Sequence, residues 1–197
     1  MIAVYIAIGL VAALAIYVIV AYNRFVAQRQ LITDSWRDID VELQRRHDLI
    51  PNLVATVKGY AAHEQAIFEA VATARANAIQ AAGASPTDRE RAETDVTQRL
   101  GRLFAVAEAY PELKASANFQ QLQHELSDTE DRLAAARRFY NGNVRDYNTR
   151  VQSFPSNLIA STAHFETETF FDIADASIAE PVQVNLDDPG QPKSSSR

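Results

Sequence analysis

The sequence predicts an all-α protein: one N-terminal transmembrane helix followed by an antiparallel bundle of long helices. Three observations lead to this expectation. The chain opens with a long uncharged apolar stretch, apolar residues then recur at alternating spacings of four and three, and helix boundary signals stand near residues 83–86, 110–111 and 155. The alternating spacing is typical of helices that pack at shallow angles in bundles and coiled coils.

Residues 2–22 contain no charged side chain. As a helix they would span ~31 Å at ~1.5 Å per residue, which matches the hydrocarbon core of a bilayer. Tyr5 and Tyr22 lie near the two ends and Arg24 follows, as expected of residues at the membrane interface. A cleaved signal peptide would have a basic leader and a shorter apolar run. The sequence therefore predicts a retained anchor at residues 1–22.

Arginines follow the predicted span, at Arg24, Arg29 and Arg37, and no Lys or Arg precedes it. The positive-inside bias then predicts a cytoplasmic location for the rest of the chain. Few charges decide this orientation, so a periplasmic or extracellular location stays open. Within the span, Gly9 and Ala13 form a small-xxx-small pair of the kind that brings transmembrane helices together.

The first helix of the bundle is predicted to continue from the span and to fade towards Gly83. Charged residues interrupt its apolar seam at only three positions. Two of these residues, Arg46 and Glu64, are expected to need partners. A buried charge costs several kcal/mol unless it is paired. The two residues are ~27 Å apart along one helix, so each needs a partner elsewhere. The seam reads Phe25, Arg29, Ile32, Trp36, Ile39, Leu43, Arg46, Ile50, Leu53, Val57, Tyr60, Glu64, Ile67, Val71.

Pro51 falls inside this helical pattern and predicts a structural joint. Within a helix, proline removes one hydrogen bond, costs ~3 kcal/mol or more and bends the axis. Alternatively, Asp48 caps a new helix, and Pro51 lies in its first turn, where the N–H would be unpaired anyway. The apolar spacing passes through Pro51 unchanged, so the sequence leaves a kink and a restart both open.

A second helix is predicted to begin at Ser85, which can cap it, with Pro86 in the first position and Asp88 at the positive end of the dipole. It should stop before Pro111, because the residue before a proline disfavours helical geometry. A third helix of roughly 35 residues should run from Ser116 to Pro155. Ser156 is then expected to cap a short helix.

Inside the third helix, Asn141, Gly142 and Asn143 form a run of poor helix formers. One interpretation is a close-packing or ligand-facing site. The favoured interpretation is a helix that tolerates these residues because its aromatic neighbours are anchored in the core, with a neighbouring helix approaching closely at Gly142.

Residues 23–175 number about 150, enough to bury about 70% of the unfolded chain's surface in one bundle domain. Residues 176–197 turn polar, with Pro, Gly and Ser, and predict a disordered tail. Seven of the 25 acidic residues lie between 166 and 188, where Lys and Arg are absent. Elsewhere the charges nearly balance, so there is no basic field for nucleic acid.

No catalytic, cofactor-binding or metal-binding residues are predicted. The chain has no cysteine, and neither His63 nor His124 has the second histidine of the zinc-protease motif. No histidine has a glutamate three residues before it, which di-iron bundles require. Arg45, Arg46, His47 and Asp48 could bind an anion or a partner, but solvated or interhelical ion pairing on a bundle surface is the favoured interpretation.

Four segments, taken together and in order, resemble the LemA family of bacterial membrane-anchored proteins. They are "YNRFVAQRQLITDSWRDIDVELQRRHDLIPNLVATVKGYAAHE", "YPELKAS", "RRFYNGNVRDYN" and "FPSNLIA", spread over residues 22–160. The resemblance implies a single anchor in the bacterial cytoplasmic membrane and an antiparallel helical bundle. It carries over no catalytic or binding residue.

The first functional hypothesis is a non-enzymatic, membrane-anchored scaffold that self-associates through its heptad seams. The alternative is an adaptor or regulator of another membrane protein, such as a membrane protease or an envelope-stress component, with the acidic tail as a contact surface. A metal-dependent enzyme is a remote third hypothesis.

Overall fold

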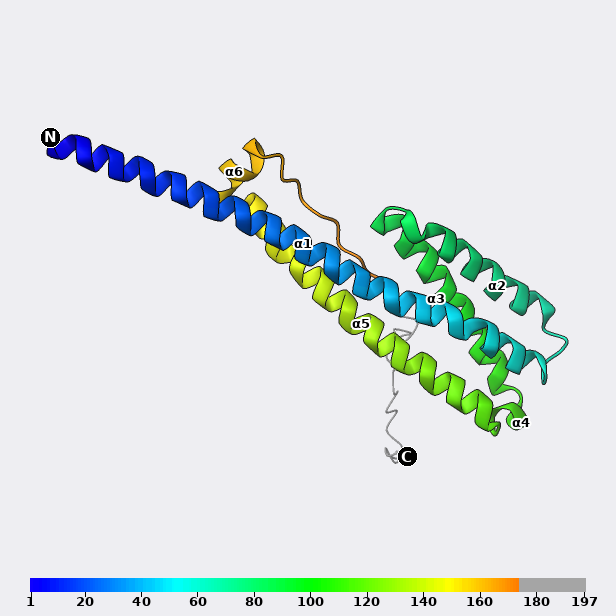
Figure 1. Ribbon diagram of the computed structural model, residues 1–197. Helices are drawn as coiled ribbons and strands as arrows, with labels where there is room; N and C mark the ends of the chain where they lie inside the picture. The colour runs from blue at the N-terminus through cyan, green and yellow to red at the C-terminus, as the bar shows by residue number, and fades with distance from the viewer. Residues whose placement is uncertain (174–197) are drawn as a thin grey trace, which may run out of the picture.

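The computed structural model describes residues 1–173, and within that range it contains helices and connecting segments but no strand, which confirms the all-α class. The predicted tail at 176–197 lies outside the described residues. Figure 1 shows the order of the elements. They are α1 (Ile2–Lys58), α2 (Gln65–Gln80), the 3-10 turn η1 (Ala81–Gly83), α3 (Pro86–Glu108), α4 (Pro111–Lys114), α5 (Ala117–Gln152) and α6 (Ser156–Thr162).

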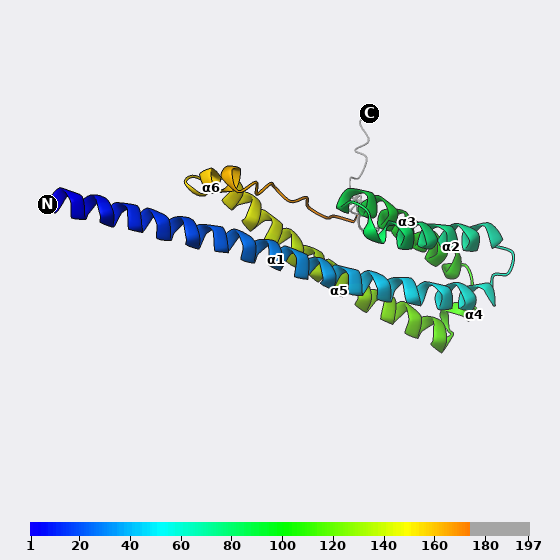
Figure 2. The same ribbon diagram turned by 45° about the horizontal axis from the view of Figure 1, so that its top comes forward.

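The bundle consists of two antiparallel helix pairs. The bundle part of α1 packs along α5, α2 packs along α3, and the single turn of α4 connects the two pairs at the far end. Beyond the bundle, the first part of α1 projects alone, as Figures 1 and 2 both show. This apolar part is the only stretch in the described chain that is long and apolar enough to cross a membrane.

One predicted boundary is wrong, since the first long helix ends at Lys58 and not near Gly83. The chain turns over residues 59–64 and returns as α2, so the bundle has four main helices where three were expected. The reversal lets Phe68, Val71 and Ala74 pack beside Val57 in one core cluster. The apolar spacing identifies the residues that face a core, but it does not show whether the helix carrying them stays straight. Gly59, the residue after α1, is the local sign that the helix ends, because glycine is a poor helix former.

Most of the helix boundaries predicted further along the chain are confirmed. The Ser85 side chain accepts a hydrogen bond from the Asp88 backbone N–H at 3.2 Å, and Pro86 is the first residue of α3, as predicted. Ser116 precedes α5, which ends three residues before Pro155. Ser156 does not cap α6: it is the first residue of that helix, and its hydroxyl donates to the carbonyls of Arg150 and Ser153.

The core is divided into two apolar clusters by a layer of buried polar residues. The cluster next to the projecting part of α1 includes Phe25, Ile39 and Tyr147, and the far cluster includes Ile50 and Leu103. Between them lie the buried polar residues Arg46, His47, Glu93 and Thr129. Buried charge is costly unless it is paired, so this polar layer is the first place to look for a functional or structural site.

Candidate functional site: a buried ionic cluster and the groove beside it

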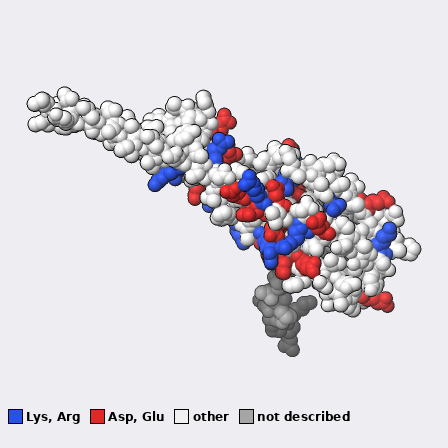
Figure 3. Space-filling model, in the orientation of Figure 1, with Lys and Arg blue, Asp and Glu red and all other residues white. Residues whose placement is uncertain are grey.

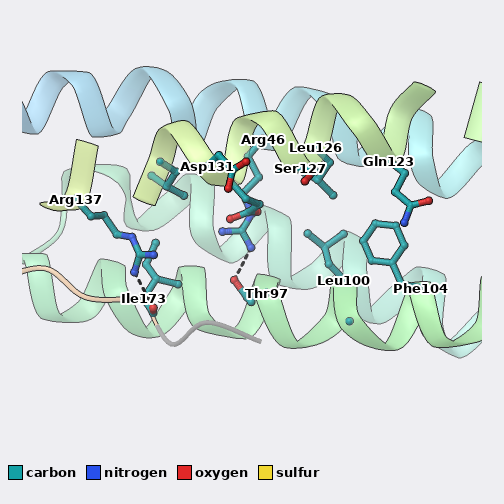
Figure 4. A pocket seen from close by; sticks show the side chains of 13 residues that line it. Arg46, Thr97, Leu100, Phe104, Gln123, Leu126, Ser127, Asp131, Arg137 and Ile173 are labelled. Atoms are coloured by element: carbon teal, nitrogen blue, oxygen red, sulfur yellow. Dashed lines mark hydrogen bonds and ion pairs between the residues drawn. The ribbon is translucent and has the colours of Figure 1, made fainter. Parts of the chain in front are cut away.

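Arg46 is fully buried where α1, α3 and α5 meet. Its Nη2 donates to Thr97 Oγ1 at 2.6 Å, and its Nη1 lies 3.8 Å from Glu93 Oε2. Its Nε lies 3.1 Å from Glu130 Oε1, without the alignment of a hydrogen bond. Arg46 therefore has two acidic partners, each from a different helix, and Figure 4 shows it at the base of a groove.

His47 follows Arg46 and shares one of its partners. Its Nε2 lies 3.1 Å from Glu93 Oε1, and both side chains are buried. The hydrogen bond of His47 Nε2 is to Glu93 Oε2, at 3.3 Å, so the histidine and the arginine both contact the same carboxylate oxygen. Buried polar groups that bond one another rigidify a core and fix its register, so the arrangement joins α1 to α3 at one height.

Helix α1 continues through Pro51 without a break, so Asp48 starts no new helix. Asp48 lies within α1, and its carboxylate accepts a hydrogen bond from Gln44 Nε2 at 2.8 Å. Pro51 has no N–H to give to the carbonyl of His47. Arg75 on α2 supplies the missing donor, because its Nε lies 2.7 Å from His47 O. The proline therefore exposes a backbone acceptor that holds α2 against α1.

This arrangement predicts an energetic coupling between Pro51 and Arg75. Arg75→Ala should lower the free energy of unfolding by about 1–3 kcal/mol, because it leaves a part-buried carbonyl unpaired. In the Pro51→Ala background the new N–H can bond that carbonyl, so the same change should cost less. Urea titration followed by the fluorescence of Trp36, the only tryptophan, measures both differences. Equal costs in the two backgrounds would contradict the coupling.

A second buried arginine, Arg89, lies on the side of this cluster that is nearer the projecting part of α1. It forms an ion pair with Asp40 and donates to the carbonyl of Ala82 at 3.2 Å. Its guanidinium carbon lies 5.4 Å from the centre of the Trp36 ring, within the range of a cation–π interaction. Arg46 and Arg89 together connect α1 to α3 through ionic contacts at two heights.

The run around Asn141 binds a peptide segment of the same chain. Residues 165–173 have no helix or strand and run back along the bundle (Figure 1). Asn141 donates to the carbonyl of Phe171 and accepts from its N–H, at 2.8 and 2.9 Å. Asn148 forms the same pair of bonds with Glu168, both at 2.8 Å. A side-chain amide can bond both groups of an extended residue in this way.

The close helix approach expected at Gly142 is therefore wrong, since no atom of another element lies within 4 Å of a Cβ placed there. Asn141 and Tyr140 face the segment 165–173 instead, while Asn143 donates to Ser35 Oγ on α1 at 3.3 Å. Tyr140 donates its hydroxyl to Thr169 O at 2.8 Å. Burial, and to a lesser degree Glu168, raises the pKa of Tyr140 to about 12, so this donor keeps its proton at physiological pH.

The groove beside Arg46 lies between α3 and α5 and holds about 450 Å³. It forms because α3 packs mainly on α2 and α5 packs mainly on α1. Leu100 and Phe104 line one wall, and Leu126 and Asp131 line the other. Arg137 closes one end, where its Nη1 donates to Ile173 O at 2.7 Å. Both apolar and charged surface is therefore available to a bound segment.

The remaining residues singled out from the sequence lie apart from this site. Glu64 is half-buried at the residue before α2, and the described residues offer it no ion pair. It therefore does not share a straight helical seam with Arg46. Tyr5, Tyr22 and Arg24 all lie on the exposed surface of α1, and their contact with a membrane stays a prediction.

Among the described residues, no group of three or more His, Asp or Glu side chains could hold a metal ion. The sequence reasoning missed the binding role of Asn141 and Asn148 and the groove. One signal was available: the two asparagines are seven residues apart, two helical turns, and so lie on one face.

The profile of the LemA family matches residues 35–186. The chain belongs to the LemA family. Two relatives, Magnetosome protein MamQ 2 and MamQ 1 of Paramagnetospirillum magneticum, are 26% identical over 174 residues. Magnetosome protein MamQ of Magnetospirillum gryphiswaldense is 25% identical over the same length. These alignments cover 76% of this chain but only 64% of each relative.

Proposed function

We propose that this LemA-family chain is a membrane-anchored scaffold without catalytic activity. The observation that carries the proposal is the continuity of α1, which runs as one helix from the apolar N-terminal stretch into the core of the bundle. A span joined without a linker fixes the distance of the bundle from the bilayer. The buried charges support a structural role, because Arg46 and His47 both contact Glu93 and all three side chains are shielded from solvent.

Self-association, if it is part of this function, needs a surface other than the heptad seam. Phe25, Ile39 and Leu43, all seam residues, are completely buried within the single chain. The pair Gly9 and Ala13, in contrast, is exposed on the projecting part of α1. Small residues spaced in this way let transmembrane helices approach closely. We therefore assign self-association to the span.

Light scattering of the full chain in mild detergent tests this assignment. We expect a discrete oligomer that Gly9→Leu converts to a monomer, because the larger side chain keeps two spans apart. Ala7→Leu is the matched control, since Ala7 lies on the opposite side of the helix and should leave the oligomer intact. A monomeric unmodified chain would contradict self-association and would leave the anchor proposal standing.

An adaptor role is the second candidate, and the groove between α3 and α5 favours it. A photo-crosslinking amino acid at Phe104 would report on the groove, and one at exposed Phe139 would report on surface outside it. In cells, an adaptor should crosslink to another membrane protein from position 104 only. A chain ending at residue 175 shows whether the acidic tail is needed. Capture of nothing beyond a second copy from position 104 would favour the scaffold alone.

A further inference from the structure

The turn from α5 into α6 lies at the height where the apolar part of α1 ends. Helix α5 runs antiparallel to α1, so its last residues point back towards the N-terminal span. The ring of Phe165, just after α6, lies 5.5 Å from the ring of Tyr22 and 4.8 Å from that of Phe25. Ala21, the penultimate residue of the apolar stretch, is buried. The bundle therefore reaches the base of the span at this point.

This turn exposes large apolar side chains while its other side is already used in the core. Ala160 is buried, and Ile159 packs against the apolar cluster that contains Phe25 and Tyr147. Phe154 and Leu158 are 80% and 58% exposed. Apolar side chains on both sides of so short a helix are unusual for a surface in water, and a contiguous apolar patch generally marks a contact site.

The same stretch carries no formal charge. Between Arg150 and Glu166 the chain has no Asp, Glu, Lys or Arg. On the face shown in Figure 3, the region of α6 continues the uncharged surface of the projecting part of α1, and the charged side chains lie mainly further along the bundle. An uncharged apolar surface that adjoins a membrane span suits the lipid interface, where apolar side chains insert to ~5–10 Å.

We propose that Phe154 and Leu158 form a second membrane contact, inserting into the lipid interface beside the span. The proposal rests on the membrane anchor proposed above. A single span fixes the position of the bundle but leaves rotation about the span axis open. A second contact on one side of α1 fixes that rotation and holds α6 at the bilayer, so that the groove between α3 and α5 keeps one orientation.

Because the chain has no cysteine, single labels can be placed without other changes. Phe154→Cys, Leu158→Cys, Leu10→Cys and Phe139→Cys would each carry an environment-sensitive fluorophore. The full-length proteins would be reconstituted in vesicles of equal parts phosphatidylcholine and phosphatidylglycerol, with or without doxyl-labelled lipid. Leu10 reports on the span. Phe139 is the matched control, since it is 54% exposed and lies 15 residues before Phe154, ~22 Å along α5.

We expect doxyl lipid to remove most of the emission from labels at Leu10, Phe154 and Leu158, and to leave the label at Phe139 nearly unchanged. Quenching at Leu10, with Phe154 and Leu158 behaving like Phe139, would overturn the second contact and leave the anchor intact. No quenching at Leu10 would overturn the anchor, and the second contact with it. A blue shift at Phe154 that depends on protein density and resists doxyl lipid would assign the patch to a second copy and overturn the proposal.

Discussion

Replacing Arg46 with methionine is expected to lower the free energy of unfolding by about 3–5 kcal/mol, the range for removing one partner of a buried ion pair. The change leaves Glu93 with no arginine, and that carboxylate is completely shielded from solvent. Glu130 is 42% exposed, so water can compensate for its loss. Most of the expected cost therefore comes from Glu93. Urea titration of the full chain in detergent, followed by Trp36 fluorescence, measures it.

Two variants separate the loss of the ion pair from other effects. Arg45→Met removes the neighbouring arginine, whose side chain is 52% exposed and contacts Glu42; it should change stability by less than ~1 kcal/mol. The double variant Arg46→Met, Glu93→Gln removes the unpaired charge and keeps a bonding partner for His47. It should recover much of the stability lost in the single variant. A double variant less stable than Arg46→Met would contradict this account.

The elements that the sequence predicted correctly are those with local signals. Ser85 and Pro86 start a helix through a side-chain cap and a fixed backbone angle, which need only neighbouring residues. Similarly, the helix that begins after Ser116 carries one apolar face over its whole length. The apolar stretch at residues 2–22 is helical as predicted, while its crossing of a membrane, expected from length and composition, stays a prediction.

The features that the sequence did not predict depend on residues far apart in the chain. The reversal at Gly59 has only a weak local signal, and it is stabilised by the burial of α2 against α1 and α3. The position of Arg46 on the apolar seam showed that this charge would need a partner. The seam could not identify Glu93 and Glu130 as the partners. Those partners follow from the relative height of three helices, which a single sequence does not give.

No secondary structure was predicted for the segment 165–173, for a related reason. Its apolar residues follow no helix or strand periodicity. Its backbone is held instead by side chains of α5. Asn141 looked like a defect in a helix when its partner was unknown, and Asn148 alone gave no signal. With Phe171 and Glu168 in place, both asparagines have a bonding role, and the poor helix propensity of asparagine is offset by two hydrogen bonds each.

Phe171→Ala is expected to release this segment from the bundle. Phe171 is completely buried, and its ring packs edge-on against Trp36 at 5.0 Å. Removing a buried phenylalanine costs about 3–5 kcal/mol. Because the segment lies outside the helices, it should open locally while the bundle stays folded. Amide hydrogen exchange at residues 168 and 171, whose N–H groups bond Asn148 and Asn141, should then accelerate roughly 100- to 4000-fold, since ~1.4 kcal/mol is a factor of ten.

Phe170→Ala is the matched control, because Phe170 is the adjacent residue and is 47% exposed. In Phe170→Ala, the exchange rates at residues 168 and 171 should stay within a few-fold of the rates in the unmodified chain. Unchanged exchange in Phe171→Ala would show that the asparagine contacts alone hold the segment, and equal acceleration throughout α5 would show that the segment opens only with the whole bundle. In contrast, acceleration confined to the segment would make residues 165–173 a separable unit. Since Ile173 lines the groove beside Arg46, such release would also open one end of that groove.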